Sequence, residues 1–358
     1  MSLSYDHGGN VFTVARALGV TASQILDFSA SINPLGMSPQ VRAALIHSLD
    51  TLVHYPDSSH AELKQTLADY HRLPAQNFTI ANGSTELIYN LPAMVPGRKA
   101  LIISPSFSEY VRALTQHGWE IEHFVLTPES GFAIDLARLE QTVAGGVDVL
   151  FLCNPGNPGG ILYPQSVVEA VYRLCQSAGT FLVLDEAFMD FCEEGSAKQM
   201  IAGSDKAVIL RSMTKFFAIP GLRLGYAICN EPLAERLGSM GGPWSVNTLA
   251  LTAGVAALQD SAHNRRSLEF VQQERTALCE LLKRFSQLKL YPSRANYLLI
   301  ETMSGPTARE IKEKLMEHRI MIRDCTNFTG LTDRFFRIAV RTCEENTFLI
   351  ENLGRMVA

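Results

Sequence analysis

The sequence lacks the features that mark several large classes of protein. No run of basic residues interleaved with aromatics occurs, and 31 basic and 36 acidic side chains leave a net charge of only −5, so nothing indicates a nucleic-acid partner. No uninterrupted apolar stretch is long enough to span a bilayer. The N-terminus, residues 1–7, has neither the basic start nor the apolar run of a signal peptide. We therefore expect a cytoplasmic protein that binds neither nucleic acid nor membrane.

Patterns typical of metal sites and disulfide frameworks are also absent. The seven cysteines occur singly between Cys153 and Cys343, with no Cys-x-x-Cys pair. The nine histidines are scattered and form no His-x-x-x-His cluster. We expect buried free thiols in a reducing compartment and no metal site.

What is present is an ordinary globular composition, 47% apolar and 19% charged, over 358 residues. This length suits one large domain and a smaller one. The middle of the chain alternates short apolar runs with helical patterns such as 164–178, which predicts an α/β fold with a mostly parallel central sheet. Strands buried on both faces are nearly continuous in apolar residues, and the sequence predicts them at 101–104, 147–153, 180–185, 207–211 and 224–228.

From about residue 264 the pattern changes to that of a smaller α+β domain. A long amphipathic helix is predicted at 268–285, strands at 297–301, 320–323 and 335–340, and helices at 308–318 and 344–356. We therefore divide the chain into an N-terminal segment, 1–45, that packs with the small domain or with a partner subunit, a large domain, 46–262, and a small domain, 263–358.

The most informative segment surrounds Lys215. The strand at 207–211 would deliver this lysine to a sheet edge, with Ser212 three residues before it and Arg223 eight residues after it. Pyridoxal phosphate needs an amine to form a Schiff base, and its phosphate needs hydroxyl, backbone N–H and guanidinium donors. The segment suits that cofactor, although Ser-x-x-Lys also occurs in acyl-enzyme hydrolases.

Two further segments could complete such a site. Gly83, Ser84 and Thr85 stand between the short apolar run 78–80 and a helical pattern, where they could bind a phosphate or simply cap the helix. Asp185 ends an apolar strand, and a carboxylate there needs a partner. That partner could be a protonated pyridine nitrogen or an ordinary cationic side chain.

Four more residues are candidates on weaker grounds. Asn157 could hold the phenolic oxygen of the cofactor ring, or belong only to a turn rich in proline and glycine. Phe107 could stack on the ring, although an aromatic there is more often core. Tyr55 could donate its hydroxyl to a phosphate across a dimer interface. Arg337 alternates with apolar residues, and its planar guanidinium suits the α-carboxylate of an amino acid.

The order of these motifs resembles that of fold-type I pyridoxal phosphate enzymes, and within them the histidinol-phosphate aminotransferase group, over essentially the whole chain. The matching motifs are Asn82-Gly83-x-Thr85-Glu86, Asn157-Pro158, Asp185-Glu186-Ala187, Ser212-x-x-Lys215 and Gly221-Leu222-Arg223-x-Gly225. Segments 7–10, 27–36, 185–188, 243–247 and 294–297 are most similar to the L-threonine-O-3-phosphate decarboxylases of cobamide (vitamin B12) synthesis.

The resemblance implies a role for each candidate residue. Lys215 would carry the cofactor, Asp185 would pair with its ring nitrogen, and Arg337 would hold the substrate carboxylate. The cofactor phosphate would be bound by Tyr55, Ser84, Thr85, Ser212 and Arg223. His7, Asn33 and Arg323 would face the substrate, with Arg323 suited to a phosphate monoester. A homodimer is expected, and the substrate is expected to be a phosphorylated amino acid.

The resemblance also favours one reaction. Many aminotransferases have tyrosine after Asp-Glu-Ala, whereas this chain has Phe188, a difference shared with the phosphothreonine decarboxylases. We therefore expect L-threonine O-3-phosphate to be converted to (R)-1-aminopropan-2-yl phosphate and CO₂. Histidinol-phosphate aminotransferase is the alternative. L-serine O-phosphate is a second possible substrate, because one methyl group discriminates by only about 1–3 kcal/mol. Gly156 and Gly159 also depart from the aminotransferase pattern, with no purpose that the sequence reveals.

Overall fold

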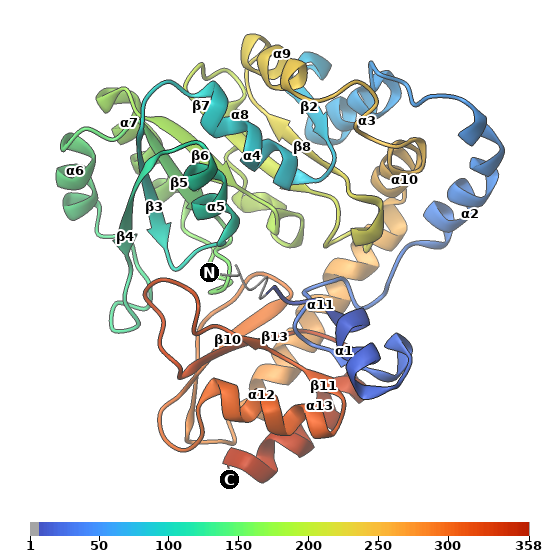
Figure 1. The fold of residues 1–358 in the computed structure, drawn as a ribbon, viewed down its shortest axis with the longest axis vertical. Helices are drawn as coiled ribbons and strands as arrows, with labels where there is room; N and C mark the ends of the chain where they lie inside the picture. Colours follow the sequence, from blue (N-terminus) through green and yellow to red (C-terminus); the bar gives the residue numbers. More distant parts are fainter. Residues whose placement is uncertain (1–6, 358) are drawn as a thin grey trace.

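The structure of the protein, a computed structural model, describes residues 7–357 (Figure 1). The first six residues, on which the expectation about a signal peptide largely rests, lie outside this range. The α-helices are α1 (Val11–Leu18), α2 (Pro39–His47), α3 (Ala61–His71), α4 (Ser84–Met94), α5 (Glu109–Gln116), α6 (Leu136–Ala144), α7 (Gln165–Ala178), α8 (Lys198–Ile201), α9 (Glu231–Met240), α10 (Thr248–Gln259), α11 (Ser261–Leu282), α12 (Ala308–Glu317) and α13 (Cys343–Val357).

The strands form three sheets. A seven-stranded sheet has the order β2-β8-β7-β6-β5-β3-β4, a four-stranded sheet has the order β12-β13-β10-β9, and β1 pairs with β11. The strands are β1 (Leu26–Asp27), β2 (Phe78–Ala81), β3 (Lys99–Ser104), β4 (Glu120–Val125), β5 (Val149–Cys153), β6 (Phe181–Asp185), β7 (Ala207–Ser212), β8 (Gly225–Ile228), β9 (Leu288–Leu290), β10 (Tyr297–Thr302), β11 (Ile320–Met321), β12 (Arg323–Asp324) and β13 (Phe335–Ala339).

The seven-stranded sheet confirms the predicted α/β fold. Its strands run parallel from β7 through β6, β5 and β3 to β4, and only β8 runs antiparallel to its neighbours β7 and β2. All five predicted apolar strands are present, as β3, β5, β6, β7 and β8. The prediction omitted β4, an edge strand whose polar residues leave it mostly half-buried. Residues 78–80, noted only as a short apolar run, form most of β2.

Helices cover both faces of this sheet, which is why its strands are apolar throughout. Alternate strand residues enter two separate core clusters, as Leu182 and Leu184 do on one face and Phe181 and Val183 do on the other. Helices α3, α6, α7 and α10 contribute to the first cluster, and α4, α5 and α9 contribute to the second. The sheet and these helices make up the large lobe of the molecule (Figure 1).

The small lobe consists of the four-stranded antiparallel sheet and the helices α12 and α13, and α11 connects it to the large lobe (Figure 1). Helix α11 begins at Ser261, earlier than predicted, because Asp260 caps it by accepting a hydrogen bond from the His263 backbone N–H at 3.0 Å. The strand predicted at 320–323 is two short strands, since β11 pairs with β1 whereas β12 pairs with β13.

The N-terminal segment contacts both lobes. Strand β1 runs parallel to β11, and Phe28 is completely buried in the core of the small lobe. Helix α2 instead packs on α10 of the large lobe. The boundaries near residues 45 and 262 stay predictions.

Two expectations, one about the cysteines and one about membrane-spanning segments, can be compared with the structure. All seven cysteines are free, but Cys279 is only half-buried and Cys343 is exposed, so the expectation of burial was wrong for these two. Among residues 7–357, no helix combines the length and the apolar character that crossing a membrane requires.

Candidate active site

A cavity of about 240 Å³ opens between the two lobes and collects most of the predicted site residues. The carboxyl ends of the parallel strands β3, β5, β6 and β7 all meet at this edge of the sheet, where α/β proteins place their sites. The small lobe supplies the opposite wall. The predicted residues that line the cavity are His7, Ser84, Thr85, Phe107, Asn157, Asp185, Ser212, Lys215, Arg223, Arg323 and Arg337.

Lys215 lies three residues beyond the end of β7 and lines the cavity. Burial, together with the positive charges of Arg337 and Arg223, lowers the pKa of its amine to about 8, while the negative charge of Asp185 opposes the shift. An amine with this pKa is neutral in an appreciable fraction of molecules near neutral pH. It is therefore far better prepared to attack a carbonyl carbon or accept a proton than an ordinary lysine.

Asp185 is the last residue of β6, and only 3% of its surface is exposed. Its Oδ2 accepts a hydrogen bond from the Tyr110 hydroxyl at 2.5 Å, and its Oδ1 accepts one from the Ala187 backbone N–H at 2.9 Å. Burial raises the pKa of this carboxyl, while those two bonds and the charge of Lys215 oppose the rise. A cation placed against Asp185 would favour its ionised form.

The N-terminus of α4 forms a cradle for an anion. Gly83 caps this helix with a φ of +77°, and Ser84 and Thr85 of its first turn line the cavity. A Cβ on Gly83 would lie 2.7 Å from Nη2 of Arg223, and a Cβ on Gly225 would lie 2.3 Å from the backbone N of Ser84. Gly83 needs glycine because of this φ, and Gly225 needs it because a Cβ would collide with the backbone of the helix start.

Arg323 and Arg337 extend from the small lobe into the same cavity. The Nη2 atom of Arg337 donates to the carbonyl of Ser29 at 2.9 Å, its Nη1 donates to Oδ1 of Asn157, and its buried Nε has no hydrogen-bond partner among residues 7–357. Arg323 donates to the carbonyl of Asp324 and to Oδ1 of Asn327, both at 2.8 Å. Both guanidinium groups are buried and line the cavity, where they suit an anionic ligand.

Three predicted residues have a different position. The side chain of Asn33 donates to the carbonyl of Phe216 and to Oγ of Ser267, both at 2.8 Å, and its backbone N–H donates to the carbonyl of Lys215 at 3.0 Å. It braces the lysine loop and does not line the cavity. Tyr55 is 78% exposed and lies outside the cavity of its own chain. Gly83 lies behind the cavity wall, against Arg223.

The prediction missed two buried residues that support the site. Tyr110 is completely buried and bonds Asp185, and Glu109 is 7% exposed and bonds His7. Both begin α5, just after Phe107, and the only available signal was a glutamate and a tyrosine beside a candidate site residue. The cavity is also lined by Ser29, Ser31, Ser108, Cys153, Thr214 and Phe328.

A buried ion-pair network fixes the strand ends behind the cavity. Arg211 has no exposed surface, and its guanidinium contacts Glu186 at 3.0 Å, Glu193 at 2.7 Å and Asp190 at 3.4 Å. Glu186 directly follows Asp185 and Arg211 directly precedes Ser212, so the pair joins the ends of β6 and β7 next to both site residues. Removing one partner of such a pair would leave a buried charge uncompensated.

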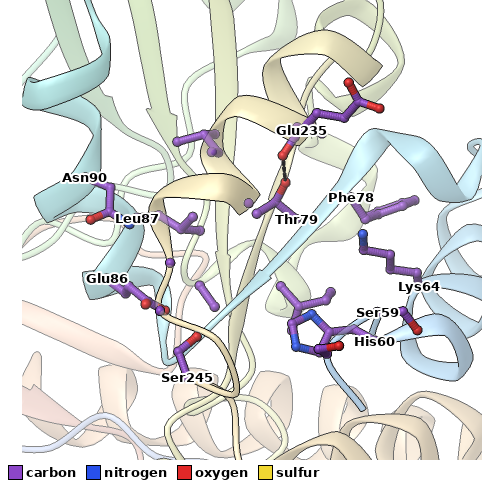
Figure 2. A pocket seen from close by; sticks show the side chains of 18 of the residues that line it. Ser59, His60, Lys64, Phe78, Thr79, Glu86, Leu87, Asn90, Glu235 and Ser245 are labelled. Atoms are coloured by element: carbon purple, nitrogen blue, oxygen red, sulfur yellow. Dashed lines mark hydrogen bonds between the residues drawn. The ribbon is translucent and has the colours of Figure 1, made fainter. Parts of the chain in front are cut away.

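A second hollow, of about 490 Å³, lies near the N-termini of α3 and α4 (Figure 2). Its wall includes His60, Lys64, Glu86 and Ser245, whereas Ser84 and Thr85, on the same helix turn as Glu86, line the cavity described above. None of the predicted site residues lines this hollow. It borders Trp244, on which the exposed Tyr55 stacks with ring centroids 4.5 Å apart.

The residues around the first cavity fit pyridoxal phosphate. Lys215 offers an amine of lowered pKa, and the buried carboxyl of Asp185 suits a protonated ring nitrogen. The glycine-dependent cradle at Ser84 and Arg223, with Ser212 and Thr85, offers the donors that a phosphate needs. Phe107 also lines the cavity and could stack on the ring.

Comparison with known proteins agrees with this fit. A model of the family described as aminotransferase class I and II matches residues 23–353. The threonine-phosphate decarboxylase of Salmonella typhimurium is 40% identical over 353 residues, which cover 98% of this chain and 96% of that protein. Among solved structures, the histidinol-phosphate aminotransferase from Clostridium acetobutylicum has a TM-score of 0.86 at 28% identity and covers 92% of this chain and 98% of its own. The L-threonine-O-3-phosphate decarboxylase from Porphyromonas gingivalis has a TM-score of 0.80 at 28% identity, covering 92% of this chain and 99% of its own. The chain belongs to the aminotransferase class I and II family.

Proposed function

We propose that this protein is a pyridoxal-phosphate-dependent decarboxylase that converts L-threonine O-3-phosphate to (R)-1-aminopropan-2-yl phosphate and CO₂, the reaction that the resemblance assigns to cobamide synthesis. The observation that carries the proposal is the 40% identity to a threonine-phosphate decarboxylase along nearly the whole chain. The cavity supports it independently, because two buried guanidinium groups from the small lobe suit a substrate with a carboxylate and a phosphate.

Arg337 is the residue proposed to bind the substrate carboxylate. Its Nη1 is held by Asn157 and its Nη2 by Ser29, which fixes the plane of the guanidinium. A fixed plane fixes the direction in which a carboxylate bonds, and therefore which bond at Cα is aligned for cleavage. Arg323 is proposed to bind the phosphate at the other end of the substrate, so that the two anchors together orient Cα.

Asp185 and Lys215 are proposed to handle the protons. The bound cofactor would supply an electron sink for the electron pair that the departing CO₂ leaves at Cα. Asp185 would keep a proton on the ring nitrogen, and its fixed bonds to Tyr110 and Ala187 mean that it need not reorganise. The amine of Lys215, with a pKa of about 8, can deliver a proton to Cα after CO₂ has left.

Phe188 supports decarboxylation over amino transfer. It lines the cavity and packs edge-on against Tyr297, with ring centroids 4.9 Å apart. The Tyr297 hydroxyl donates to the carbonyl of Gly156 at 2.7 Å. Because residue 188 is phenylalanine, it offers no hydroxyl where many aminotransferases have tyrosine. Asn157 is then the remaining predicted partner of the phenolic oxygen of the cofactor.

The proposed functional unit is a cytoplasmic homodimer. An exposed apolar surface combines the end of α2 and the segment after it with the exposed Trp244: Ile46, Leu49, Leu52, Val53, Tyr55 and Trp244. A surface of this kind favours contact with a second copy, which would place Tyr55 near the partner's cofactor phosphate. The free state of all seven thiols supports the reducing cytoplasm as the location.

The proposal is tested with the cofactor-loaded protein and two substrate mixtures. L-threonine O-3-phosphate alone should yield CO₂ and aminopropanol phosphate in equal amounts. Histidinol phosphate with 2-oxoglutarate should yield no glutamate. Glutamate formation without CO₂ release would instead assign the chain to the histidinol-phosphate aminotransferases.

A further inference from the structure

The first described residues, His7 to Asn10, form a strap along one edge of the cavity. A Cβ on Gly8 would lie 2.1 Å from the carbonyl oxygen of Ser29, so only glycine permits this close approach. The Gly9 backbone N–H donates to Oγ of Ser29 at 2.9 Å, and Ser29 in turn donates to Asp27 at 2.5 Å. One side of the strap is thus attached to the segment that also holds Arg337.

The other side of the strap contacts the large lobe through His7, which lies against the Phe107 ring, with centroids 5.8 Å apart, and bonds a carboxylate. Nε2 of His7 lies 2.7 Å from Oε1 of Glu109, at the start of α5. Glu109 is only 7% exposed, and its Oε2 accepts a hydrogen bond from the Tyr89 hydroxyl at 2.6 Å. Nη1 of Arg112 lies 3.2 Å from its Oε1. Three donors therefore surround one buried carboxylate.

We infer that Glu109 is a positioning residue, which holds His7 over the cavity and thereby sets the preference for a phosphorylated substrate. This inference rests on the proposed function, because His7 is useful there as a donor to the substrate phosphate. A carboxylate is only an acceptor, so Nε2 of His7 must donate to it. The other ring nitrogen, Nδ1, is then the one left for the substrate, and it can donate to a phosphate in the doubly protonated form of the ring.

The contact between His7 and Glu109 also joins the two lobes. The strap is tied to Ser29, which bonds Arg337 of the small lobe, while Glu109 and Tyr89 belong to α5 and α4 of the large lobe. Helix α4 also carries Ser84 and Thr85 at its start. One carboxylate thus connects the substrate side of the cavity to the helix that forms the phosphate cradle.

The test uses Glu109→Gln, His7→Ala and the double variant in the cofactor-loaded enzyme, with the exposed Glu120→Gln as a matched control. Glutamine keeps the shape of Glu109 and removes its charge, which protects the fold. Loss of a charge-assisted hydrogen bond should raise KM for L-threonine O-3-phosphate about tenfold in Glu109→Gln, with kcat changed by less than about twofold. If Glu109 acts through His7, the double variant should be no worse than His7→Ala alone. Additive effects in the double variant would overturn the inference.

A second measurement does not depend on turnover. Hydrogen–deuterium exchange of the peptide that contains Gly8 to Asn10 should become at least about threefold faster in Glu109→Gln, because the strap loses its anchor. It should not change in Glu120→Gln. Unchanged exchange in Glu109→Gln would also overturn the inference. If the unaltered enzyme released no CO₂, the proposed function would fail while the exchange result still decided whether Glu109 holds the strap.

Discussion

Arg323 and Arg337 are directly opposite each other on the antiparallel strands β12 and β13. Both are buried, with 5% and 7% of their surfaces exposed, and both line the cavity that contains Lys215. Like charges directly across a strand pair destabilise a sheet. The positive charge of Arg337 also lowers the pKa of Lys215. An anionic substrate bound between the two guanidinium groups would reduce this repulsion.

Removing Arg323 should therefore affect one end of the substrate only. In Arg323→Ala, the ratio of kcat/KM for L-threonine O-3-phosphate to that for free L-threonine should fall at least about tenfold, because a charge-assisted phosphate contact is lost. Arg337→Ala should instead reduce kcat/KM for both compounds, since both have the carboxylate. The exposed Arg309→Ala on α12 is the control. An unchanged ratio in Arg323→Ala would exclude it from phosphate binding.

Burial of the Lys215 amine should be visible in the stability of the cofactor-free protein. The folded chain loses this proton near pH 8, whereas the unfolded chain retains it to about pH 10.5. The free energy of unfolding should therefore increase as the pH rises between those two values. At pH 7 the buried cation should cost about 3 kcal/mol, because the two pKa values differ by about 2.5 units, and Lys215→Met should be more stable by about that amount. The difference should shrink as the pH approaches 10. Urea titrations at pH 7 and pH 10 measure this difference in stability, with the exposed Lys206→Met as control. Equal stability of Lys215→Met and the unaltered protein at pH 7 would show that the buried amine has no such cost.

Tyr110→Phe should weaken cofactor binding with little effect on the fold. The phenylalanine ring would keep the packing against Phe151, whose centroid lies 5.1 Å away, but Asp185 would lose the hydroxyl that lowers its pKa. The carboxylate would then ionise less readily and pair less well with a ring nitrogen. We expect the cofactor Kd to rise about tenfold, as for the loss of a hydrogen bond to a charged group. Tyr172→Phe on α7 is the control, and an unchanged Kd in Tyr110→Phe would show that the contact has no such effect.

Tyr55 should serve the partner's active site, and subunit mixing can test this directly. Tyr55→Ala and Lys215→Ala should each be nearly inactive alone. In a hybrid dimer, one site would carry both defects and the other neither, so a randomised equal mixture should recover about a quarter of the full activity. If Tyr55 acted in its own chain, every site in the hybrid would carry a defect and no activity would return. Sedimentation must show dimers in each preparation.

The parts of the site that the sequence predicts share one physical cause. Strand-end residues such as Asp185 and Ser212 follow continuous apolar runs, and parallel strands bring their carboxyl ends to one edge. Gly83 and Gly225, which permit the close contacts around Ser84 and Arg223, likewise stand in local motifs of the sequence. These residues could be placed without knowledge of how the helices pack.

The remaining parts depend on contacts between elements that no local pattern encodes. The bond from Tyr110 to Asp185 and the one from His7 to Glu109 connect residues 75 and 102 positions apart in the chain. Asn33 is assigned to the substrate by resemblance alone, and its amide bonds the carbonyl of Phe216, Oγ of Ser267 and the backbone N–H of Leu35. The edge strand β4 was omitted because polar residues interrupt its apolar pattern.

The most direct test of the central claim is turnover of L-threonine O-3-phosphate labelled with ¹³C at the carboxyl carbon, in D₂O, followed by mass spectrometry. Decarboxylation by this enzyme should give labelled CO₂ in an amount equal to the amine product, with one solvent deuterium at the former Cα, because that carbon takes an exchangeable proton after CO₂ leaves. Retention of the ¹³C label in a 2-oxo acid, with no labelled CO₂, would contradict it.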